Sequence, residues 1–250
     1  MVYSARKNNA NFIPVYSVLY PETSSDSASG KSNGVRLHSA NAQIKKIKKP
    51  KGVILDLRWD PGGYLDAAID VTSFFLKEGV AVKKILRTDQ DSTAVTGKAV
   101  MPDVPLVVLI NSGSASASEI VSGALQDLDR AVIVGCRSFG KGLVQRPIDM
   151  TYGTQVKVTI SRYYTPSGRC IQALDYWHKD KDGKAVRTDA SKYNAFKTKK
   201  GRTVYDGGGI QPDVELADSK LSTIAEVLQK NDAIFNYVTY YYYKNPNLGN

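Results

Sequence analysis

Residues that build disulfide frameworks and metal clusters are scarce in this sequence. Its 250 residues include only two cysteines, Cys136 and Cys170, too few for the disulfide network of a small secreted scaffold. The two histidines, His38 and His178, cannot form a metal cluster on their own. We therefore expect neither a metal site nor a bound cofactor.

Long apolar runs are also missing. No segment approaches the roughly 18 to 20 consecutive apolar residues of a membrane-spanning helix, and residues 1–12 lack the apolar stretch of a secretory signal. We expect no membrane span and no targeting signal in this chain. Hydrophobic residues nevertheless make up 42% of the sequence, enough to bury a sizeable core in one large domain or two small ones.

Acidic residues are outnumbered, because 34 Lys and Arg residues face 24 Asp and Glu and give a formal net charge of +10. A basic face of this kind can bind nucleic acid through its phosphates. The lysines, however, concentrate in residues 45–51 and 179–200, and neither segment has the interleaved aromatic pattern of a base-stacking surface. We interpret them as solvated surface and expect no nucleic-acid partner.

The first fifty residues differ in composition from the rest. Residues 23–34 read TSSDSASGKSNG, a Ser/Gly-rich stretch typical of a flexible loop or linker. Apolar residues at helical spacing over 37–47 then predict one amphipathic helix that ends before Pro50. We therefore divide the chain into a reduced leader, residues 1–50, and a main domain, residues 51–250.

Strand-like and helix-like segments alternate after residue 51. Short branched apolar runs predict strands, and apolar residues three and four positions apart predict helices. The expected order is strand, helix, strand, helix, strand over residues 52–58, 64–78, 104–110, 118–128 and 131–134. Such alternation predicts a βαβ core with a mostly parallel sheet, which places the domain in the α/β class.

The second half of the domain has different patterns. A period of two over residues 143–164 predicts antiparallel strands that finish the sheet. The charged segment 175–205 predicts surface excursions, and the glycines at 207–209 with Pro212 predict an extended, turning segment after it. Residues 221–238 predict a final helix leading to the tyrosine-rich TYYYYK.

Small and hydroxylic residues gather where the second strand meets the second helix, in NSGSASASE at residues 111–119. Ser116 followed three positions later by Glu119 fits a capping box, in which hydroxyl and carboxylate bind free backbone N–H groups. A serine at a helix entrance also lies beside unpaired N–H groups and the positive end of the helix dipole, which can stabilise an oxyanion. Both interpretations of Ser116 stay open, and a nucleophile there requires a base.

Lysine is a better candidate base than histidine in this chain. His38 lies in the polar leader and His178 in a charged segment, which gives a Ser-His-Asp arrangement little support. A lysine base needs a pKa well below about 10.4, which burial or neighbouring charge can provide. Lys141 lies between two glycines after the apolar AVIVG, where close packing can desolvate it, although an ordinary loop lysine fits the same spacing. On an extended chain Gln145 points to the same face and can orient the lysine amine.

Residues 135–142, GCRSFGKG, also come close to the phosphate-binding pattern GxxxxGK[ST]. The match fails at its last position, where Gly142 replaces the Ser or Thr that holds magnesium. A strand-like LVQRPI follows, instead of the helix that receives phosphates. Nucleotide hydrolysis is therefore the weaker hypothesis.

Three separated motifs resemble the C-terminal processing, or tail-specific, peptidase family in order and spacing. They are LDLRWDPGG at 55–63, GSASASE at 113–119 and SFGKGLVQ at 138–145. The segment GRTVYDGGGIQPDVEL at 201–216 is similar to the family's closing GIxPDV stretch. The resemblance covers roughly residues 51–216.

The resemblance implies a serine-type endopeptidase that works through an acyl-enzyme. It implies a Ser-Lys dyad supported by glutamine, which carries over to Ser116, Lys141 and Gln145, and an oxyanion hole built from the backbone N–H groups of Gly62 and Ala117. It further implies a crotonase/ClpP-like sheet-and-helix core and protein or peptide substrates with apolar, unstructured C-terminal tails. By the same analogy we expect a bacterial protein of the periplasm or cell envelope.

Two departures from the family pattern leave an alternative open. Asp60 stands where the family commonly has Asn, and a charge beside an oxyanion hole weakens it. Residues 1–50 are too short and too polar to supply the family's PDZ domain, so we expect that domain to be missing. The alternative function is a catalytically latent core that acts as a peptide-binding or scaffolding module.

Overall fold

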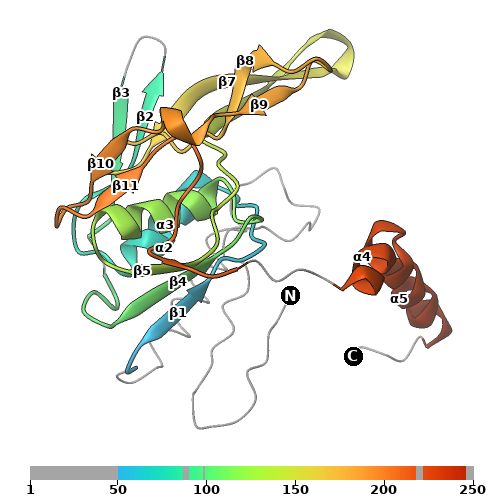
Figure 1. Cartoon of the computed structure of the whole chain (residues 1–250), viewed down its shortest axis with the longest axis horizontal. Coiled ribbons are helices and arrows are strands. Elements are labelled where there is room, and N and C mark those ends of the chain that lie inside the picture. Colours follow the sequence, from blue (N-terminus) through green and yellow to red (C-terminus); the bar gives the residue numbers. More distant parts are fainter. Residues whose placement is uncertain (1–49, 87–89, 98, 218–221, 246–250) are drawn as a thin grey trace. The chain divides into compact units, whose positions relative to one another are not determined.

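The computed structural model describes residues 50–86, 90–97, 99–217 and 222–245 (Figure 1). The chain divides into two compact units, Met1–Leu216 and Ala217–Asn250, which are described separately below. The linker expected at 23–34 and the helix expected at 37–47 lie outside the described residues. The domain boundary expected at residue 50 stays a prediction.

A four-stranded parallel sheet forms one layer of the first unit. Its order is β1-β4-β5-β12, and the strands are Val53–Asp56, Leu106–Ile110, Val132–Gly135 and Val214–Glu215. Helix α2, Leu65–Ser73, lies between β1 and β4 in sequence, and α3, Ala117–Asp127, lies between β4 and β5. The βαβ alternation predicted from the sequence is therefore confirmed, with each helix close to its expected place.

A second, antiparallel sheet lies on the other side of the helices (Figure 1). Its order is β3-β2-β7-β6, and the strands are Gln90–Ala94, Val80–Leu86, Gln155–Tyr164 and Leu143–Asp149. The antiparallel pairing predicted over 143–164 is confirmed. These strands do not finish the parallel sheet as predicted, because they pair instead with the β2–β3 hairpin.

The hydrophobic core fills the space between these layers. In β4 the side chains of Leu106, Val108 and Ile110 are buried, and every residue of α3 is buried as well. A helix is buried all round when it is covered on both faces, and α3 contacts both β5 and β2. Each fully buried aliphatic side chain contributes about 1.5–3 kcal/mol, so this packing holds α3 between the two sheets.

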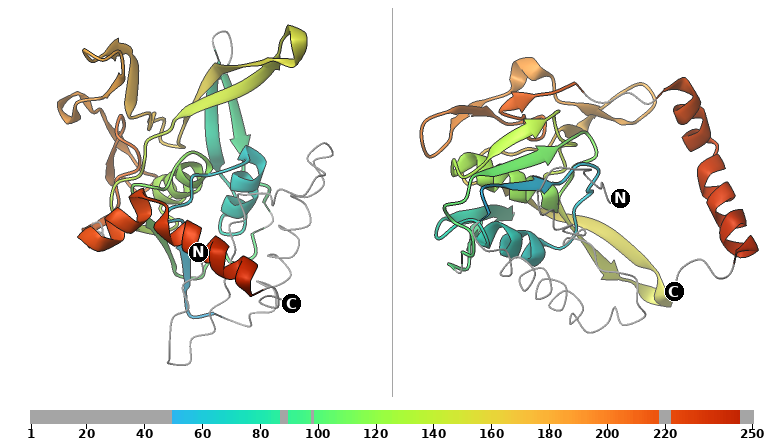
Figure 2. Two further views of the ribbon diagram at one scale, coloured as in Figure 1. Left: turned by 90° about the vertical axis from the view of Figure 1, so that its right-hand side faces the viewer. Right: turned by 90° about the horizontal axis from the view of Figure 1, so that it is seen from below.

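The charged segment after β7 forms the predicted surface excursions as short hairpins. Strands β8, Leu174–Lys179, and β9, Ala185–Arg187, form one hairpin, and β10, Ala195–Lys197, and β11, Thr203–Tyr205, form another. The β6–β7 hairpin also extends beyond the rest of the unit (Figure 2). Tyr152, between the two strands, is fully exposed.

The closing segment of the first unit returns to the parallel sheet. Strand β12 pairs with β5, and the Asp213 carboxylate accepts a hydrogen bond of 2.8 Å from Ile133 N–H. Arg169, inside the fold, forms an ion pair of 2.7 Å with Asp127 at the end of α3, and neither side chain is exposed. Gln126 accepts a further bond of 2.6 Å from the same guanidinium. These contacts hold the C-terminal end of α3.

The second unit consists of two consecutive helices. The single helix predicted over 221–238 is instead two helices, α4 from Thr223 to Lys230 and α5 from Ala233 to Lys244. The break falls at Asp232, whose left-handed backbone (φ 51°) interrupts the helical path. The tyrosine-rich end lies within α5, where Tyr237 and Tyr241 stack with ring centroids 6.1 Å apart. No helix in the described parts of either unit is long and apolar enough to cross a membrane.

Candidate active site

Ser116 occupies the sharp turn between β4 and α3. It is the N-cap residue of α3, with φ 56° and ψ −114°. A positive φ at a residue with a side chain costs on the order of 1–3 kcal/mol and persists only where the surroundings fix it. The surroundings here are the buried strand before Ser116 and the buried helix after it.

The carboxylate of Glu119 ties this turn to the loop that carries Lys141. The capping box predicted for Ser116 and Glu119 is present, and Oε2 of Glu119 accepts the Ser116 N–H at 2.8 Å. The same oxygen accepts the Lys141 N–H at 2.9 Å. Oε1 accepts the Gly140 N–H at 2.7 Å and the Ser138 hydroxyl at 2.5 Å. One buried carboxylate therefore joins two segments that the sequence analysis treated as separate motifs.

The electrostatics of Glu119 follow from this position. Its side chain has no exposed surface, and burial raises the pKa of its carboxyl above the ordinary value. The hydrogen bonds from Ser138, Lys141, Gly140 and Ser116 act in the opposite direction, because each stabilises the ionised form. The carboxylate thus depends on its donors to carry charge inside the fold.

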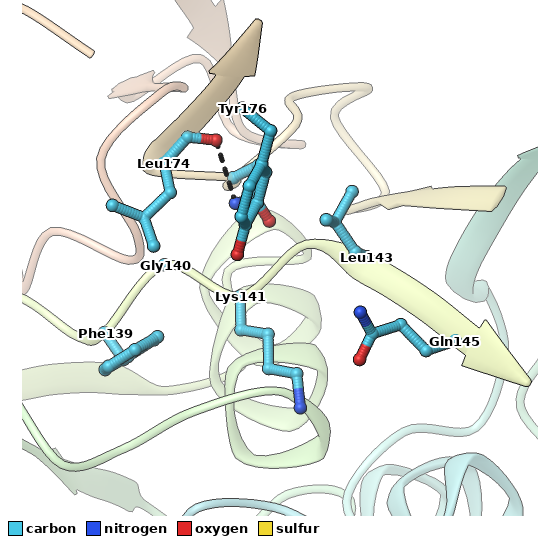
Figure 3. A pocket seen from close by; sticks show the side chains of 8 residues that line it. Phe139, Gly140, Lys141, Leu143, Gln145, Leu174 and Tyr176 are labelled. Carbon is cyan, nitrogen blue, oxygen red and sulfur yellow. Dashed lines mark hydrogen bonds between the residues drawn. The ribbon is translucent and has the colours of Figure 1, made fainter. Parts of the chain in front are cut away.

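Two adjoining cavities open where these segments meet. One, of about 290 Å³, is lined by Ser116, Lys141 and Gln145 together with Gly63, Tyr64, Leu65, Lys84, Ala117, Ile120, Leu143, Val144, Lys157 and Tyr163. The other, of about 260 Å³, shares Lys141, Leu143 and Gln145 with it. Figure 3 shows the side chains of Lys141 and Gln145 extending into this second cavity. The three side chains expected to be catalytic are therefore brought to one cavity.

The Pro-Gly-Gly turn packs directly against the Ser116 turn. Gly62 has φ 92°, and a Cβ added to it would lie 2.5 Å from the Ala115 carbonyl oxygen and 2.6 Å from the Ala117 nitrogen. The backbone of Gly62 thus lies beside that of Ala117, as an oxyanion hole built from the two residues requires. The Gly62 N–H, however, donates to Oδ1 of Asp60 at 2.9 Å. Burial raises the pKa of Asp60, while this hydrogen bond lowers it.

Tyr163 is a site residue that the sequence analysis missed. Its hydroxyl donates to the carbonyl oxygens of Ser116, at 3.3 Å, and of Lys141. A tyrosine in the alternating pattern of β7 resembles any other core aromatic, so no local signal marks it.

The competing sites considered from the sequence find no support. Lys141 is followed by strand β6, so residues 135–142 lack the helix of a phosphate-binding loop. His178 lies on β8 with an exposed side chain that contacts Asp175, and His38 lies outside the described residues. Within the described ranges no group of His, Cys, Asp and Glu side chains could hold a metal ion.

Comparison with known proteins gives a family that fits the arrangement of these residues. The model of peptidase family S41 matches residues 24–176. The chain belongs to peptidase family S41. The resemblance stated from the motifs is thereby confirmed, as is the α/β fold class with its antiparallel extension.

The S41 relatives include processing proteases from bacteria. The chain is 49% identical over 141 residues to a carboxy-terminal-processing protease of Bartonella bacilliformis, a match that covers 53% of this chain and 32% of the relative. It is 47% identical over 124 residues to a carboxyl-terminal-processing protease of Synechocystis sp., covering 49% of this chain and 29% of the relative. The chain thus matches about a third of the length of these relatives.

A solved structure gives a similar result. The photosystem II D1 C-terminal processing protease is 30% identical, with a TM-score of 0.51, and the match covers 74% of this chain and 38% of that protein. The S41 fold therefore extends over most of the chain.

Proposed function

We propose that this S41 chain is a serine endopeptidase that cleaves proteins near apolar C-terminal tails through a Ser-Lys dyad. Ser116 is the nucleophile, Lys141 the general base, and Gln145 orients the lysine amine. The observation that carries this assignment is that Ser116 and Lys141 line one cavity while a single oxygen of Glu119 binds the backbone N–H of both. Carboxy-terminal processing is the activity named for the relatives.

In the proposed reaction the amine of Lys141 takes the hydroxyl proton of Ser116 as Oγ attacks the scissile carbonyl carbon. The oxyanion that forms accepts hydrogen bonds from the backbone N–H groups of Ala117 and Gly62. Lys141 then gives its proton to the leaving amine, and the C–N bond breaks to leave an acyl-enzyme. A water molecule, deprotonated by Lys141, releases the acyl group as a carboxylic acid and restores Ser116.

The cavity walls support an apolar substrate segment. Leu65, Ile120, Leu143 and Val144 contribute aliphatic surface next to Ser116. Burying an apolar side chain against such a wall is favourable by about 25 cal/mol per Å² of apolar surface, which selects unfolded, apolar tails over charged ones. We place this activity in the bacterial periplasm or cell envelope by analogy with the family.

One observation favours the second candidate, a latent core that binds peptides without cleaving them. The Asp60 carboxylate holds the Gly62 N–H, which is one of the two donors that the oxyanion needs. In this state the chain can still accept a peptide in the cavity while catalysis is weak. The two candidates differ in turnover and share saturable peptide binding.

The deciding experiment is cleavage of an unfolded protein with an apolar C-terminal tail. The parent chain is compared with Ser116→Ala and Lys141→Ala, and with Ser191→Ala and Lys181→Ala as matched controls at exposed positions. The dyad predicts loss of cleavage in the first pair only. Cleavage by Ser116→Ala at the parent's rate would refute it. Binding without cleavage by the parent would favour the latent core.

A further inference from the structure

The Tyr163 hydroxyl contacts the backbone carbonyl oxygens of Ser116 and Lys141, the two residues of the proposed dyad. Its single hydroxyl proton is shared between the backbone carbonyl oxygens of Ser116 and Lys141, as in a three-centre hydrogen bond. Both residues lie at the ends of segments that are distant in sequence, one before α3 and one before β6. The Tyr163 hydroxyl thus connects Ser116 to Lys141.

Glu119 connects the same two residues as well, because its carboxylate accepts hydrogen bonds from both of their backbone N–H groups. Together, Glu119 and Tyr163 hold the N–H and the C=O of both Ser116 and Lys141. A residue fixed at both of its backbone polar groups has little freedom to rotate, so the directions of its side chain are restricted. In a Ser-Lys pair these directions set the distance between the hydroxyl and the amine, and a misplacement of about 1 Å can reduce the rate roughly 100-fold.

The structure holds Tyr163 rigidly enough for this role. The side chain is 3% exposed and packs in the hydrophobic core, and its backbone N–H donates to the Gly142 carbonyl at 3.0 Å. Burial raises the pKa of the Tyr163 phenol well above its ordinary value, as does the charge of Glu119. The hydroxyl therefore keeps its proton and acts as a donor at neutral pH.

We propose that Tyr163 is a positioning residue that aligns Ser116 with Lys141 by binding both of their backbone carbonyls. The proposal rests on the Ser-Lys function proposed above. Tyr163 acts through the two residues of the dyad and takes no part in bond making or breaking. Removing its hydroxyl leaves the cavity walls in place but loosens the alignment of nucleophile and base.

The test compares Tyr163→Phe with the parent in peptide cleavage and in sulfonylation of Ser116 by a sulfonyl fluoride, in which Oγ displaces fluoride from sulfur. We expect kcat and the sulfonylation rate to fall about 10- to 100-fold, with KM within about twofold of the parent. Rates are taken per site that the sulfonyl fluoride can modify, so a partly unfolded population does not change them. Tyr164→Phe, the neighbouring tyrosine on the opposite face of β7, is the matched control and keeps the parent's kcat.

A second variant distinguishes the loss of these hydrogen bonds from a folding defect. With 4-aminophenylalanine in place of Tyr163, the aniline supplies two N–H donors for the two carbonyls, and we expect it to restore most of the lost kcat. A Tyr163→Phe kcat within about twofold of an active parent, or an aniline variant as slow as Tyr163→Phe, would overturn the proposal. A parent that shows neither peptide cleavage nor sulfonylation of Ser116 contradicts the proposed function itself, which separates the two failures.

Discussion

The carboxylate of Asp60 accepts a hydrogen bond from the backbone N–H of Gly62 at 2.9 Å, within the turn that packs against the nucleophile. The turn is fixed from outside as well, because Ala115 N–H donates to the Asp60 carbonyl at 3.0 Å and Trp59 N–H to Oδ1 of Asn111 at 2.8 Å. A negative charge thus lies in a rigid turn, beside the place where the reaction develops another. The charge of Asp60 should therefore affect the rate of the proposed reaction.

Replacing Asp60 with asparagine should raise activity. The amide keeps an oxygen for the Gly62 N–H but removes the negative charge that opposes the oxyanion. We expect kcat/KM to rise by about tenfold, a fraction of the 10²–10³ that one oxyanion donor contributes. Steady-state cleavage of an apolar-tailed substrate measures the change. Asp66→Asn, on the exposed first turn of α2, serves as control, and a lower kcat/KM for Asp60→Asn would contradict the prediction.

A methyl group at residue 62 should abolish activity. In Gly62→Ala the new Cβ would meet the Ala115 oxygen and the Ala117 nitrogen at 2.5 and 2.6 Å, distances that force the two turns apart. We expect a loss of about 100-fold or more in kcat/KM, since the predicted oxyanion donors separate. Gly201→Ala is the matched control, because Gly201 has φ 86° but no atom within 4 Å of the added Cβ. Equal losses in both variants would show that backbone strain alone is responsible.

Neutralising Glu119 should lower the stability of the fold. In Glu119→Gln an NH₂ group replaces one oxygen and faces N–H and O–H donors that lose their acceptor. Each buried donor left unsatisfied costs about 1–3 kcal/mol, so urea unfolding at pH 7 should reveal a loss of that order or larger. Glu78→Gln, on an exposed position, should leave the unfolding free energy unchanged.

The same variant tests the pH dependence of folding. The pKa of Glu119 is raised in the folded chain above its ordinary value of 4.5, so the folded state binds this proton more tightly than the unfolded state. The free energy of unfolding of the parent should therefore fall, relative to Glu119→Gln, as pH rises from 4.5 through the folded pKa. Parallel pH profiles for the two proteins would show that Glu119 has no shifted titration.

Breaking the buried pair of Arg169 and Asp127 should destabilise the fold. In Arg169→Met the Asp127 carboxylate stays buried without its cation, and removing one partner of such a pair costs about 3–5 kcal/mol. Lys77→Met, which breaks the exposed 3.3 Å pair with Asp103, should cost less than about 1 kcal/mol. Denaturant unfolding of both variants gives the comparison. A loss as small for Arg169→Met as for Lys77→Met would contradict the burial argument.

The sequence predicts the parts of this fold whose signals are local. Branched apolar runs identify β1, β4 and β5, and the three-and-four spacing identifies α2 and α3. The β2–β3 hairpin escaped prediction because Lys83 and Lys84 interrupt its apolar pattern, and Gln90 to Ala94 is almost entirely polar. Its strands are specified by pairing with β7, which is a long-range contact.

The same division applies to the candidate site. Ser116, Lys141 and Gln145 were predicted from the resemblance of their motifs to the peptidase family, since turn chemistry and spacing alone left a capping serine and a loop lysine open. The contacts that Glu119 and Tyr163 make with Lys141 could not be predicted from the sequence, since they depend on how the loop after β5 and the end of β7 pack against α3. The hydrogen bond from Gly62 to Asp60 needed the actual conformation of the turn as well.

The pairing of β12 with β5 has a consequence for how this protein is made. Until the ribosome has released residues 214–215, strand β5 has an unpaired edge, and Ile133 N–H lacks the Asp213 carboxylate. The nascent chain therefore holds an incomplete sheet while all of its proposed catalytic residues have already been synthesised. Long-range closure of this kind is slow, so the pairing of β12 with β5 completes the edge of the sheet only after most of the first unit has been synthesised.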